Sequence, residues 1–297
     1  MGCGPTGSLG STDKSVGATR TPLFQIHVWS KIPHMKRTTL ALFAFLFCLT
    51  PVFAQDWAKQ TLAKSTRHQE WVAVKYGNRT VNAFIVYPEV KTKAPAVLVI
   101  SEIFGLSDWV ETVADKLAAN GYIAIAPDLL SGLGPNGKGT PDFSGADLTR
   151  AISGLPPDQV TADLNAVADY VIKVPAANGK LAVTGFCWGG GQSFRFATNR
   201  KDLSVAFVFY GLGPADVTPI NAPVYGFYAG NDARIGATVP ATKDAMKAAG
   251  KKYEDVTYDG AGHGFMRAGE DPANTVPANV TAHDQAWARV LAILKTI

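Results

Sequence analysis

The fold of this chain is constrained most by a repeated alternation of short apolar runs with segments of helical periodicity. Ala96–Ser101 (AVLVIS) is continuously apolar and of strand length, which is typical of a strand buried on both faces. In the next segment, Asp108–Asn120, the apolar residues Val110, Val113 and Leu117 recur at helical spacing. This alternation predicts an α/β fold with a mostly parallel central sheet and helices on both faces.

The same alternation continues to the end of the chain. Further strands are predicted at Tyr122–Ala126, Leu181–Gly185, Val205–Tyr210, Val224–Tyr228 and Asp255–Tyr258. Further helices are predicted at Gln159–Val171, near Gly190–Asn199, at Val239–Ala249 and at Thr281–Thr296. The Gly- and Pro-rich stretch Ser131–Gly145 predicts a long loop. No repeat or linker divides this region, so residues 56–297 are expected to form one domain.

Two β-rich runs precede the alternating region. Trp71–Tyr76 and Val81–Tyr87 are joined through Gly77-Asn78-Arg79, which is a hairpin signal. We therefore expect an antiparallel hairpin at the N-terminal end of the sheet.

Residues 35–54 have the three-part pattern of a secretory signal. Lys36 and Arg37 supply positive charge, Leu40–Leu49 is an unbroken apolar run, and a cleavage site follows near Ala54. The apolar run is too short for a permanent transmembrane helix. We expect export to the periplasm or the exterior after cleavage.

Residues 1–34 show no sustained apolar period, and we expect them to be disordered or to result from a start codon assigned too early. The pattern of a secretory signal fits best when the protein begins at Met35. A lipoprotein signal through Cys48 is a weaker alternative, because Phe47 stands where a small residue is required.

Removal of residues 1–54 changes both the charge and the cysteine content. Of the 28 basic and 24 acidic residues, this segment holds five basic residues and one acidic residue, which leaves 23 of each. The balanced charge argues against a nucleic-acid footprint and against a polybasic membrane patch. Of the 3 cysteines only Cys187 remains, so no internal disulfide is expected.

Cys187 lies in a pattern that is typical of a nucleophile. Gly185-Phe186-Cys187-Trp188-Gly189 stands between a predicted strand and a predicted helix, like a nucleophile elbow with cysteine in place of serine. Glycines leave room for the tight turn, and the positive end of the helix favours a thiolate. A Gly-rich turn of this kind can instead bind phosphate, but the Lys-Ser/Thr of a P-loop is missing here.

A base and an acid for this nucleophile are expected later in the chain. His263 lies in a glycine-flanked loop after the last predicted strand, whereas His283 is expected at a solvated position on the last helix. Asp232 follows the strand Val224–Tyr228 and is the expected partner of the imidazole, with Asp259 as the alternative. Nucleophile, acid and histidine then follow one another in the order found in α/β-hydrolases.

The loop after Ala96–Ser101 is expected to supply part of an oxyanion hole. We assign the two amides of this hole to Ile103 and Trp188. Glu102 precedes Ile103, and a carboxylate between a buried strand and an apolar loop is costly unless it is paired or used. Glu102 either forms an ion pair with an arginine or lies close to Cys187 and influences the protonation of its thiol.

At these motifs the sequence resembles the dienelactone hydrolase (carboxymethylenebutenolidase-like) family of the α/β-hydrolase superfamily. The matching motifs span most of the chain after residue 54. They are Glu102-Ile103-Phe104-Gly105, Gly121-Tyr122 with Pro127-Asp128-Leu129, Gly185-Phe186-Cys187-Trp188-Gly189-Gly190, Gly230-Asn231-Asp232 and Gly262-His263-Gly264-Phe265.

The resemblance implies an α/β-hydrolase fold and a triad of Cys187, His263 and Asp232. It also implies that Glu102 holds the resting thiol and releases it as thiolate when substrate binds. Relatives of this family grip a substrate carboxylate with arginines. Arg267 matches one of them, and Arg150 is the only arginine in the expected region for the second.

The function predicted is hydrolysis of a small lactone or carboxylic ester, with an anionic substrate and with Phe104 in the binding site. The alternatives are a thiol redox sensor and a catalytically inactive binding module. No metal or cofactor motif occurs in the sequence, so none is predicted. We expect a monomer that binds a small molecule, does not bind nucleic acid and has no permanent membrane span.

Overall fold

The computed structural model describes residues 56–297, which belong to one compact unit, Pro51–Ile297. The predicted upstream extension 1–34 and the export signal 35–54 lie outside the described residues. Within residues 56–297, no helix has both the length and the apolar character needed to cross a membrane.

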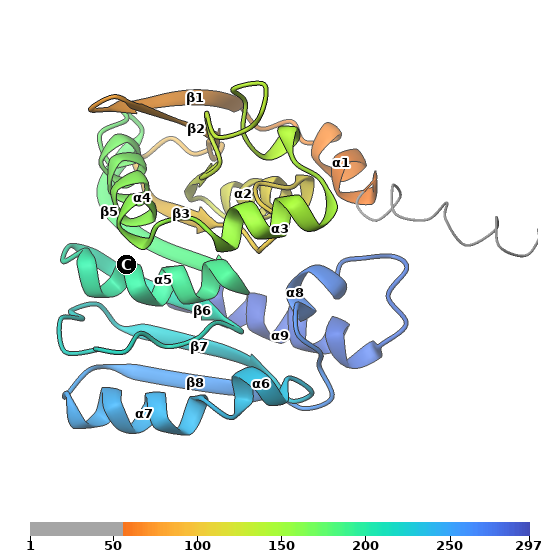
Figure 1. Ribbon diagram of the computed structural model, residues 1–297, viewed down its shortest axis with the longest axis vertical. Coiled ribbons are helices and arrows are strands. Elements are labelled where there is room, and N and C mark those ends of the chain that lie inside the picture. The colour runs from red at the N-terminus through yellow and green to blue at the C-terminus, as the bar shows by residue number, and fades with distance from the viewer. Residues whose placement is uncertain (1–55) are drawn as a thin grey trace, which may run out of the picture. The chain divides into compact units, whose positions relative to one another are not determined.

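The centre of the unit is an eight-stranded sheet with the strand order β1-β2-β4-β3-β5-β6-β7-β8 (Figure 1). The strands are β1 (Gln69–Tyr76), β2 (Arg79–Val86), β3 (Ala94–Ile100), β4 (Ile123–Pro127), β5 (Ala177–Phe186), β6 (Leu203–Phe209), β7 (Val224–Ala229) and β8 (Tyr253–Tyr258). β1 pairs with β2, and β2 with β4, in antiparallel register, and every other pairing is parallel. The predicted hairpin and mostly parallel sheet are therefore confirmed.

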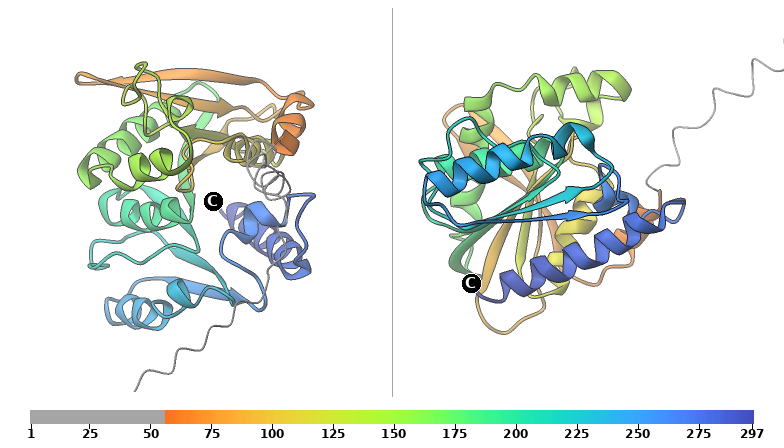
Figure 2. Two further views of the ribbon diagram at one scale, coloured as in Figure 1. Left: turned by 45° about the vertical axis from the view of Figure 1, so that its right-hand side comes forward. Right: turned by 90° about the horizontal axis from the view of Figure 1, so that it is seen from below.

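Helices cover both faces of the sheet, as predicted. They are α1 (Asp56–Ala63), α2 (Asp108–Ala119), α3 (Gly145–Ser153), α4 (Pro157–Val171), α5 (Trp188–Asn199), α6 (Ala233–Gly236), α7 (Val239–Ala248), α8 (Phe265–Ala268) and α9 (Pro277–Leu294). One apolar core joins the sheet to α3, α4, α5 and α7, and a second joins its other face to α1, α2, α8 and α9. Figure 2 shows the green and cyan helices on one side and the yellow and blue helices on the other.

Four of these helices were not expected from the sequence. Three of them, α1, α6 and α8, have eight residues or fewer, which is too short for a clear apolar period. The predicted loop Ser131–Gly145 contains a 3-10 turn at Thr140–Asp142 and leads directly into α3. Proline at the first position of α4 moves the start of that helix from Gln159 to Pro157.

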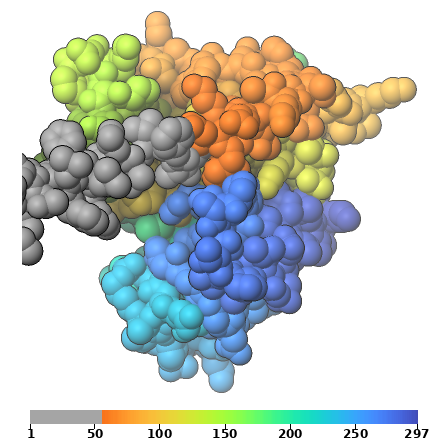
Figure 3. Space-filling model, turned by 90° about the vertical axis from the view of Figure 1, so that its right-hand side faces the viewer, coloured from red at the N-terminus to blue at the C-terminus, as the bar shows by residue number. Residues whose placement is uncertain are grey.

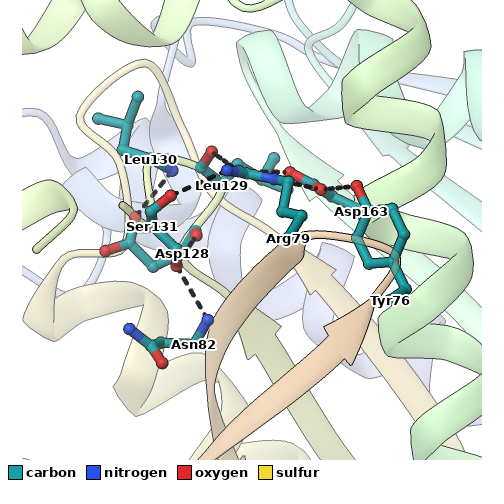
Figure 4. A network of polar contacts seen from close by, with 8 residues as sticks. All are labelled: Tyr76, Arg79, Asn82, Asp128, Leu129, Leu130, Ser131 and Asp163. Atoms are coloured by element: carbon teal, nitrogen blue, oxygen red, sulfur yellow. Dashed lines mark hydrogen bonds and ion pairs between the residues drawn. The ribbon is translucent and has the colours of Figure 1, made fainter. Parts of the chain in front are cut away.

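The hairpin is tied to the rest of the sheet by a buried polar network around Arg79 (Figure 4). Arg79 donates to both oxygens of Asp163 on α4, through Nε at 2.7 Å and Nη2 at 2.8 Å. Its Nη1 and Nη2 also donate to the carbonyl oxygens of Ser131 and Leu129, at 2.9 and 3.0 Å. Tyr76 completes the network through a hydrogen bond to Asp163. Each charged group of the pair therefore has several partners.

The prediction that His283 is solvated is wrong. Its side chain is 12% exposed, and its Nε2 lies 2.9 Å from the carboxylate of Glu270 in the loop after α8. The other carboxylate oxygen of Glu270 lies 2.6 Å from Nζ of Lys116 on α2. In Figure 3 the blue C-terminal segment lies beside the orange and yellow segments of α1 and α2. Because these contacts join distant parts of the chain, helical spacing alone did not reveal them.

Candidate active site

Cys187 lies at a tight turn between β5 and α5. Its backbone has φ 56° and ψ −116°, a region that residues other than glycine rarely occupy and that costs about 1–3 kcal/mol. The amide of Cys187 donates to the carbonyl of Phe209 on β6 at 3.0 Å, which helps to hold the turn in place. The thiol is partly exposed at the carboxyl end of the sheet.

Three glycines around Cys187 are required by close approaches of the backbone. A Cβ on Gly185 would overlap the carbonyl of Gly189, and a Cβ on Gly189 would overlap the carbonyl of Ser101 at the end of β3. A Cβ on Gly190 would overlap the carbonyl of Phe209. The first helical turn of α5 therefore packs directly on the ends of β3 and β6, the two strands that flank β5.

The structure brings Cys187, His263 and Asp232 together. The Cys187 thiol is the strongest influence on the pKa of His263, so the imidazole lies next to the sulfur. The other side of the imidazole faces Asp232, with 2.5 Å between His263 Nδ1 and Asp232 Oδ2. The hydrogen bond to Cys187 and then the one to Asp232 raise the pKa of His263 above its ordinary value, although burial opposes the shift. The imidazolium form is thus favoured next to the sulfur.

Two loops that bring Asp232 and His263 together are bonded to each other. The amide of Asn231 donates to the carbonyl of Ala261 at 2.9 Å, and the Asn231 side chain donates to the carbonyl of Gly260 at 3.0 Å. Oδ1 of Asp232 accepts from the amide of Ile235 at 3.2 Å and caps α6, which leaves Oδ2 for His263.

Glu102 lies against Arg267 on α8. Its side chain is 4% exposed, and its Oε2 accepts a hydrogen bond from Arg267 Nε at 2.8 Å. Burial raises the pKa of Glu102, while the charges of Arg267 and His263 act in the opposite direction. Of the two possibilities open from the sequence, this arrangement corresponds to the ion pair with an arginine.

The loop that carries Glu102, Ile103 and Phe104 is held by the chain after β4. Thr140 Oγ1 accepts from the amide of Leu106 at 3.2 Å and donates to the buried carboxylate of Asp128 at 2.8 Å. Phe104 is 40% exposed, and the Arg267 guanidinium lies over its ring at 5.4 Å from the centroid. Phe104 and Arg267 thus pack against each other next to Glu102.

A cavity of about 670 Å³ opens beside Cys187. Ile103 and Trp188, the two residues expected to supply oxyanion-hole amides, both line this Cys187 cavity. Trp188 is the first residue of α5, so its amide has no acceptor within the helix. The other lining residues are Gly191, Gln192, Arg195, Thr198, Tyr210, Leu212, Gly213, Pro214, Ala215, Asp216, Arg234 and Ile235.

Arg150 is placed away from this cavity, which corrects the expectation from sequence. It lies on the exposed surface of α3, with 75% of its side chain exposed, and pairs with Asp147 at 2.7 Å. The expectation depended on Arg150 being the only arginine in a stretch of sequence, but α3 directs this stretch elsewhere. Arg234 and Arg195 line the Cys187 cavity instead.

Tyr210 is a site residue that the sequence did not reveal. It is fully buried, has φ 39°, and places its ring at 5.0 Å from the imidazole of His263. The one feature of the sequence that could have indicated this role is its position at the end of a predicted strand, next to Gly211. In the described part of the chain, its hydroxyl has no side-chain hydrogen-bond partner. Burial, and then the charge of Glu102, raise its pKa well above the ordinary value, so it stays a phenol.

No group of three or more potential metal-ligating side chains occurs within residues 56–297. The prediction that the protein uses no metal or cofactor stays a prediction.

Comparison with known proteins supports the resemblance noted in the sequence. Residues 81–297 match the model of the dienelactone hydrolase family. A Salmonella typhi protein named "Putative carboxymethylenebutenolidase" is 38% identical over 189 residues, which cover 58% of this chain and 67% of that protein. A Bradyrhizobium protein named "Probable 2-oxo-3-(5-oxofuran-2-ylidene)propanoate lactonase" is 28% identical over 251 residues, 79% of this chain and 96% of that protein.

Among solved structures, a "Putative Dienelactone Hydrolase" from Klebsiella pneumoniae is similar to this chain with a TM-score of 0.68 and 26% identity. The match covers 78% of this chain and the whole of that one. An esterase from Pyrobaculum calidifontis has a TM-score of 0.60 at 15% identity, and this similarity concerns the α/β-hydrolase fold alone. The family match, the identities and the shared architecture show that this chain belongs to the dienelactone hydrolase family of carboxylic ester and lactone hydrolases.

Proposed function

We propose that the protein hydrolyses a carboxylic ester or lactone with Cys187 as its nucleophile and His263 and Asp232 as the remainder of a triad. One observation carries the proposal. Cys187 occupies a strained turn at the carboxyl end of the sheet, close enough to His263 to raise the pKa of the imidazole, and His263 itself contacts Asp232. An imidazole between a thiol and a carboxylate is the arrangement that activates a sulfur nucleophile.

The first half of the proposed reaction forms a thioester. His263 takes the thiol proton, and the Cys187 sulfur attacks the carbonyl carbon, whose π electrons move to the oxygen. The amides of Ile103 and Trp188 stabilise this oxyanion. When the carbonyl re-forms, the bond to the alkoxy oxygen breaks, and His263 protonates the leaving oxygen.

The second half returns the enzyme to its starting state. A water molecule transfers a proton to His263 and attacks the thioester carbon. The carbon–sulfur bond then breaks and the acid leaves. His263 returns its proton to the sulfur, which restores the neutral imidazole and the thiol. Asp232 holds the imidazole in one orientation and stabilises its charged form in both halves.

The Glu102–Arg267 pair supports the further proposal that the substrate is anionic. Arg267 lies at the edge of the site with 26% of its side chain exposed, so a substrate carboxylate can compete with Glu102 for the guanidinium. Release of Glu102 would leave a buried carboxylate next to His263 and Tyr210. Burial raises the pKa of this carboxylate. Once Arg267 no longer pairs with it, Glu102 can accept a proton from a neighbouring group in the site.

A turnover screen tests the nucleophile directly. Small esters and lactones, with and without an anionic group, are given to the parent protein and to Cys187→Ala. We expect turnover by the parent and a loss of about 1,000-fold or more in the variant, as for other covalent nucleophiles. Equal rates would place the nucleophile elsewhere, and consumption of hydrogen peroxide without ester turnover would favour a redox sensor.

Export is proposed as well, from the pattern of residues 35–54 alone. N-terminal sequencing of the protein recovered from its native cells is expected to begin at Gln55. A protein that begins at Met1 or Met35 and stays with the cytoplasmic fraction would contradict export.

A further inference from the structure

The Cys187 cavity extends well beyond the triad, along one side of α5. Trp188, Gly191, Gln192, Arg195 and Thr198 all line it, and their spacing of three or four residues places them on one face of the helix. From Trp188 to Thr198 this face is about 15 Å long, at 1.5 Å per residue. A small lactone would fill only the part of the groove near Cys187.

The wall opposite α5 is largely apolar. It is formed by the segment after β6, and Leu212 in this segment is 47% exposed. Ile103 and Ile235 add apolar surface close to Cys187. Because an exposed leucine in a concave wall gains most when a ligand covers it, this part of the groove fits an aliphatic chain.

The charged groups on the groove differ in whether they have partners. Arg195 is held by α4, where it donates to the carbonyl of Pro157 at 2.7 Å and to Asp158 at 3.2 Å. Asp216 is held within its own turn by the amide and hydroxyl of Thr218. Arg234 is exposed, and no carboxylate among residues 56–297 lies within ion-pair distance of it.

The position of Arg234 relative to the triad is fixed by its neighbours. It is two residues from Asp232, which contacts His263, and it precedes the buried Ile235 in α6. Asp232 and Ile235 anchor this short helix from both sides, so the base of Arg234 stays at the cavity wall. An unpaired guanidinium at that place is suited to a planar oxyanion, which it can bind through two hydrogen bonds.

We propose that the groove binds an elongated ester whose aliphatic chain lies along α5 and whose carboxylate pairs with Arg234. Arg234 is then a specificity-determining residue that favours substrates with a second carboxylate, separated from the scissile bond by the distance between Arg234 and Cys187. This inference rests on the proposed ester hydrolysis at Cys187, and it adds the substrate's length and the position of its charge.

Matched pairs of 4-nitrophenyl esters test the role of Arg234. One series consists of half-esters of dicarboxylic acids with four to eight carbons, and the other of neutral esters of equal chain length. The parent protein is compared with Arg234→Gln, Arg234→Lys and the control Arg289→Gln, which removes the same charge on α9, where Arg289 pairs with Glu254.

In Arg234→Gln, the ratio of kcat/KM for half-esters to kcat/KM for neutral esters is expected to fall about tenfold, through KM. Arg234→Lys should restore part of the preference, and Arg289→Gln should leave it unchanged. The parent's preference should be greatest at the chain length that lets the carboxylate reach Arg234. An unchanged ratio in Arg234→Gln, or an equal fall in Arg289→Gln, would overturn the inference.

The outcome separates this inference from the proposed function. If neutral esters are turned over in a Cys187-dependent way, the hydrolase proposal stands. If the ratio of kcat/KM for half-esters to kcat/KM for neutral esters is then unchanged in Arg234→Gln, the role of Arg234 is rejected. Calorimetric titration of suberate into Cys187→Ala, with and without Arg234→Gln, tests the anion site without turnover. Equal affinities in the two proteins would reject the site, and a weaker affinity with Arg234→Gln would support it.

Discussion

Two of the arginine–carboxylate pairs that have a buried carboxylate are built in different ways. In the hairpin network, Arg79 donates to both oxygens of Asp163 and to two backbone carbonyls, and Tyr76 adds a further donor. In the site, Arg267 donates to Glu102 through Nε alone and lies partly exposed beside Phe104. Both carboxylates are almost completely buried, so their different surroundings are informative.

This difference separates a structural ion pair from one that can rearrange. A largely buried pair whose arginine has several acceptors is costly to break, because the remaining charge has little water to replace its partner. A pair with one direct hydrogen bond and a partly exposed arginine can exchange its partner for a substrate anion. We therefore expect loss of Asp163 to affect stability and loss of Glu102 to affect catalysis.

The largest effect is expected from Asp163→Ala. It leaves Arg79 charged, buried and without its main partner, so the free energy of unfolding should fall by about 3–5 kcal/mol. Urea denaturation measures the loss, while kcat/KM at a temperature where the variant is folded should stay close to that of the parent. Asp158→Ala is the control, since Asp158 pairs with Arg195 from a fully exposed position. Equal stability losses in both variants would contradict the comparison.

Glu102→Gln should reverse this pattern. Loss of one buried, charge-assisted hydrogen bond predicts a fall in kcat/KM of about 10- to 100-fold, equivalent to about 1.5–3 kcal/mol. Stability should change little, because the variant also removes the cost of burying a carboxylate. Steady-state kinetics over a range of pH, with thermal unfolding in parallel, measure both quantities. If Glu102→Gln unfolds as readily as Asp163→Ala, the two pairs do not differ as proposed.

The cluster of His283, Glu270 and Lys116 sharpens the comparison through its pH dependence. Although burial opposes it, the hydrogen bond and charge of Glu270 raise the pKa of His283 above its ordinary 6.5. A raised pKa means that the stabilisation is fully present below pH 6.5 and is lost as the pH rises through the pKa of the folded state.

His283→Gln should therefore cost about 1–2 kcal/mol of stability near pH 6 and less at pH 9. Urea denaturation at the two pH values provides the measurement. Asp284, which lies 2.8 Å from Nδ1 of His283, is more exposed, so Asp284→Asn should reproduce only a small part of the effect. A larger cost at pH 9 than at pH 6 would have the wrong sign for this cluster.

The smallest effect on stability is expected from Tyr210→Phe. The buried hydroxyl has no side-chain hydrogen-bond partner in the described part of the chain, so its removal should change the free energy of unfolding by less than about 1 kcal/mol. Thermal unfolding measures the stability, and kcat/KM is measured in parallel. The contact between the aromatic ring and His263 is retained in this variant. A stability loss above about 2 kcal/mol would show that the hydroxyl is bonded in the folded protein.

Features encoded by local patterns were predictable. The positions of the strands follow from apolar runs that must be buried on both faces, and the turn at Cys187 follows from glycines that make room for it. The order of Cys187, Asp232 and His263 along the chain also places all three at the carboxyl end of one parallel sheet.

Features that depend on contacts between distant segments were not predictable. Glu102 and Arg267 are 165 residues apart, and no local pattern indicates that they pair. Arg150 has the expected residue type in the expected region, but α3 directs it to the surface. His283 has the spacing of an exposed helical residue, but the loop carrying Glu270 covers it.

The sequence by itself therefore determined the alternating α/β architecture, the strained cysteine turn and the family. These properties follow from apolar periodicity and from backbone geometry, which are encoded within a few neighbouring residues. Folding in three dimensions decided which charges are paired, which arginine lines the cavity and how far the groove extends along α5. A charged side chain acquires its role from the neighbours that burial gives it, and those neighbours come from other parts of the chain.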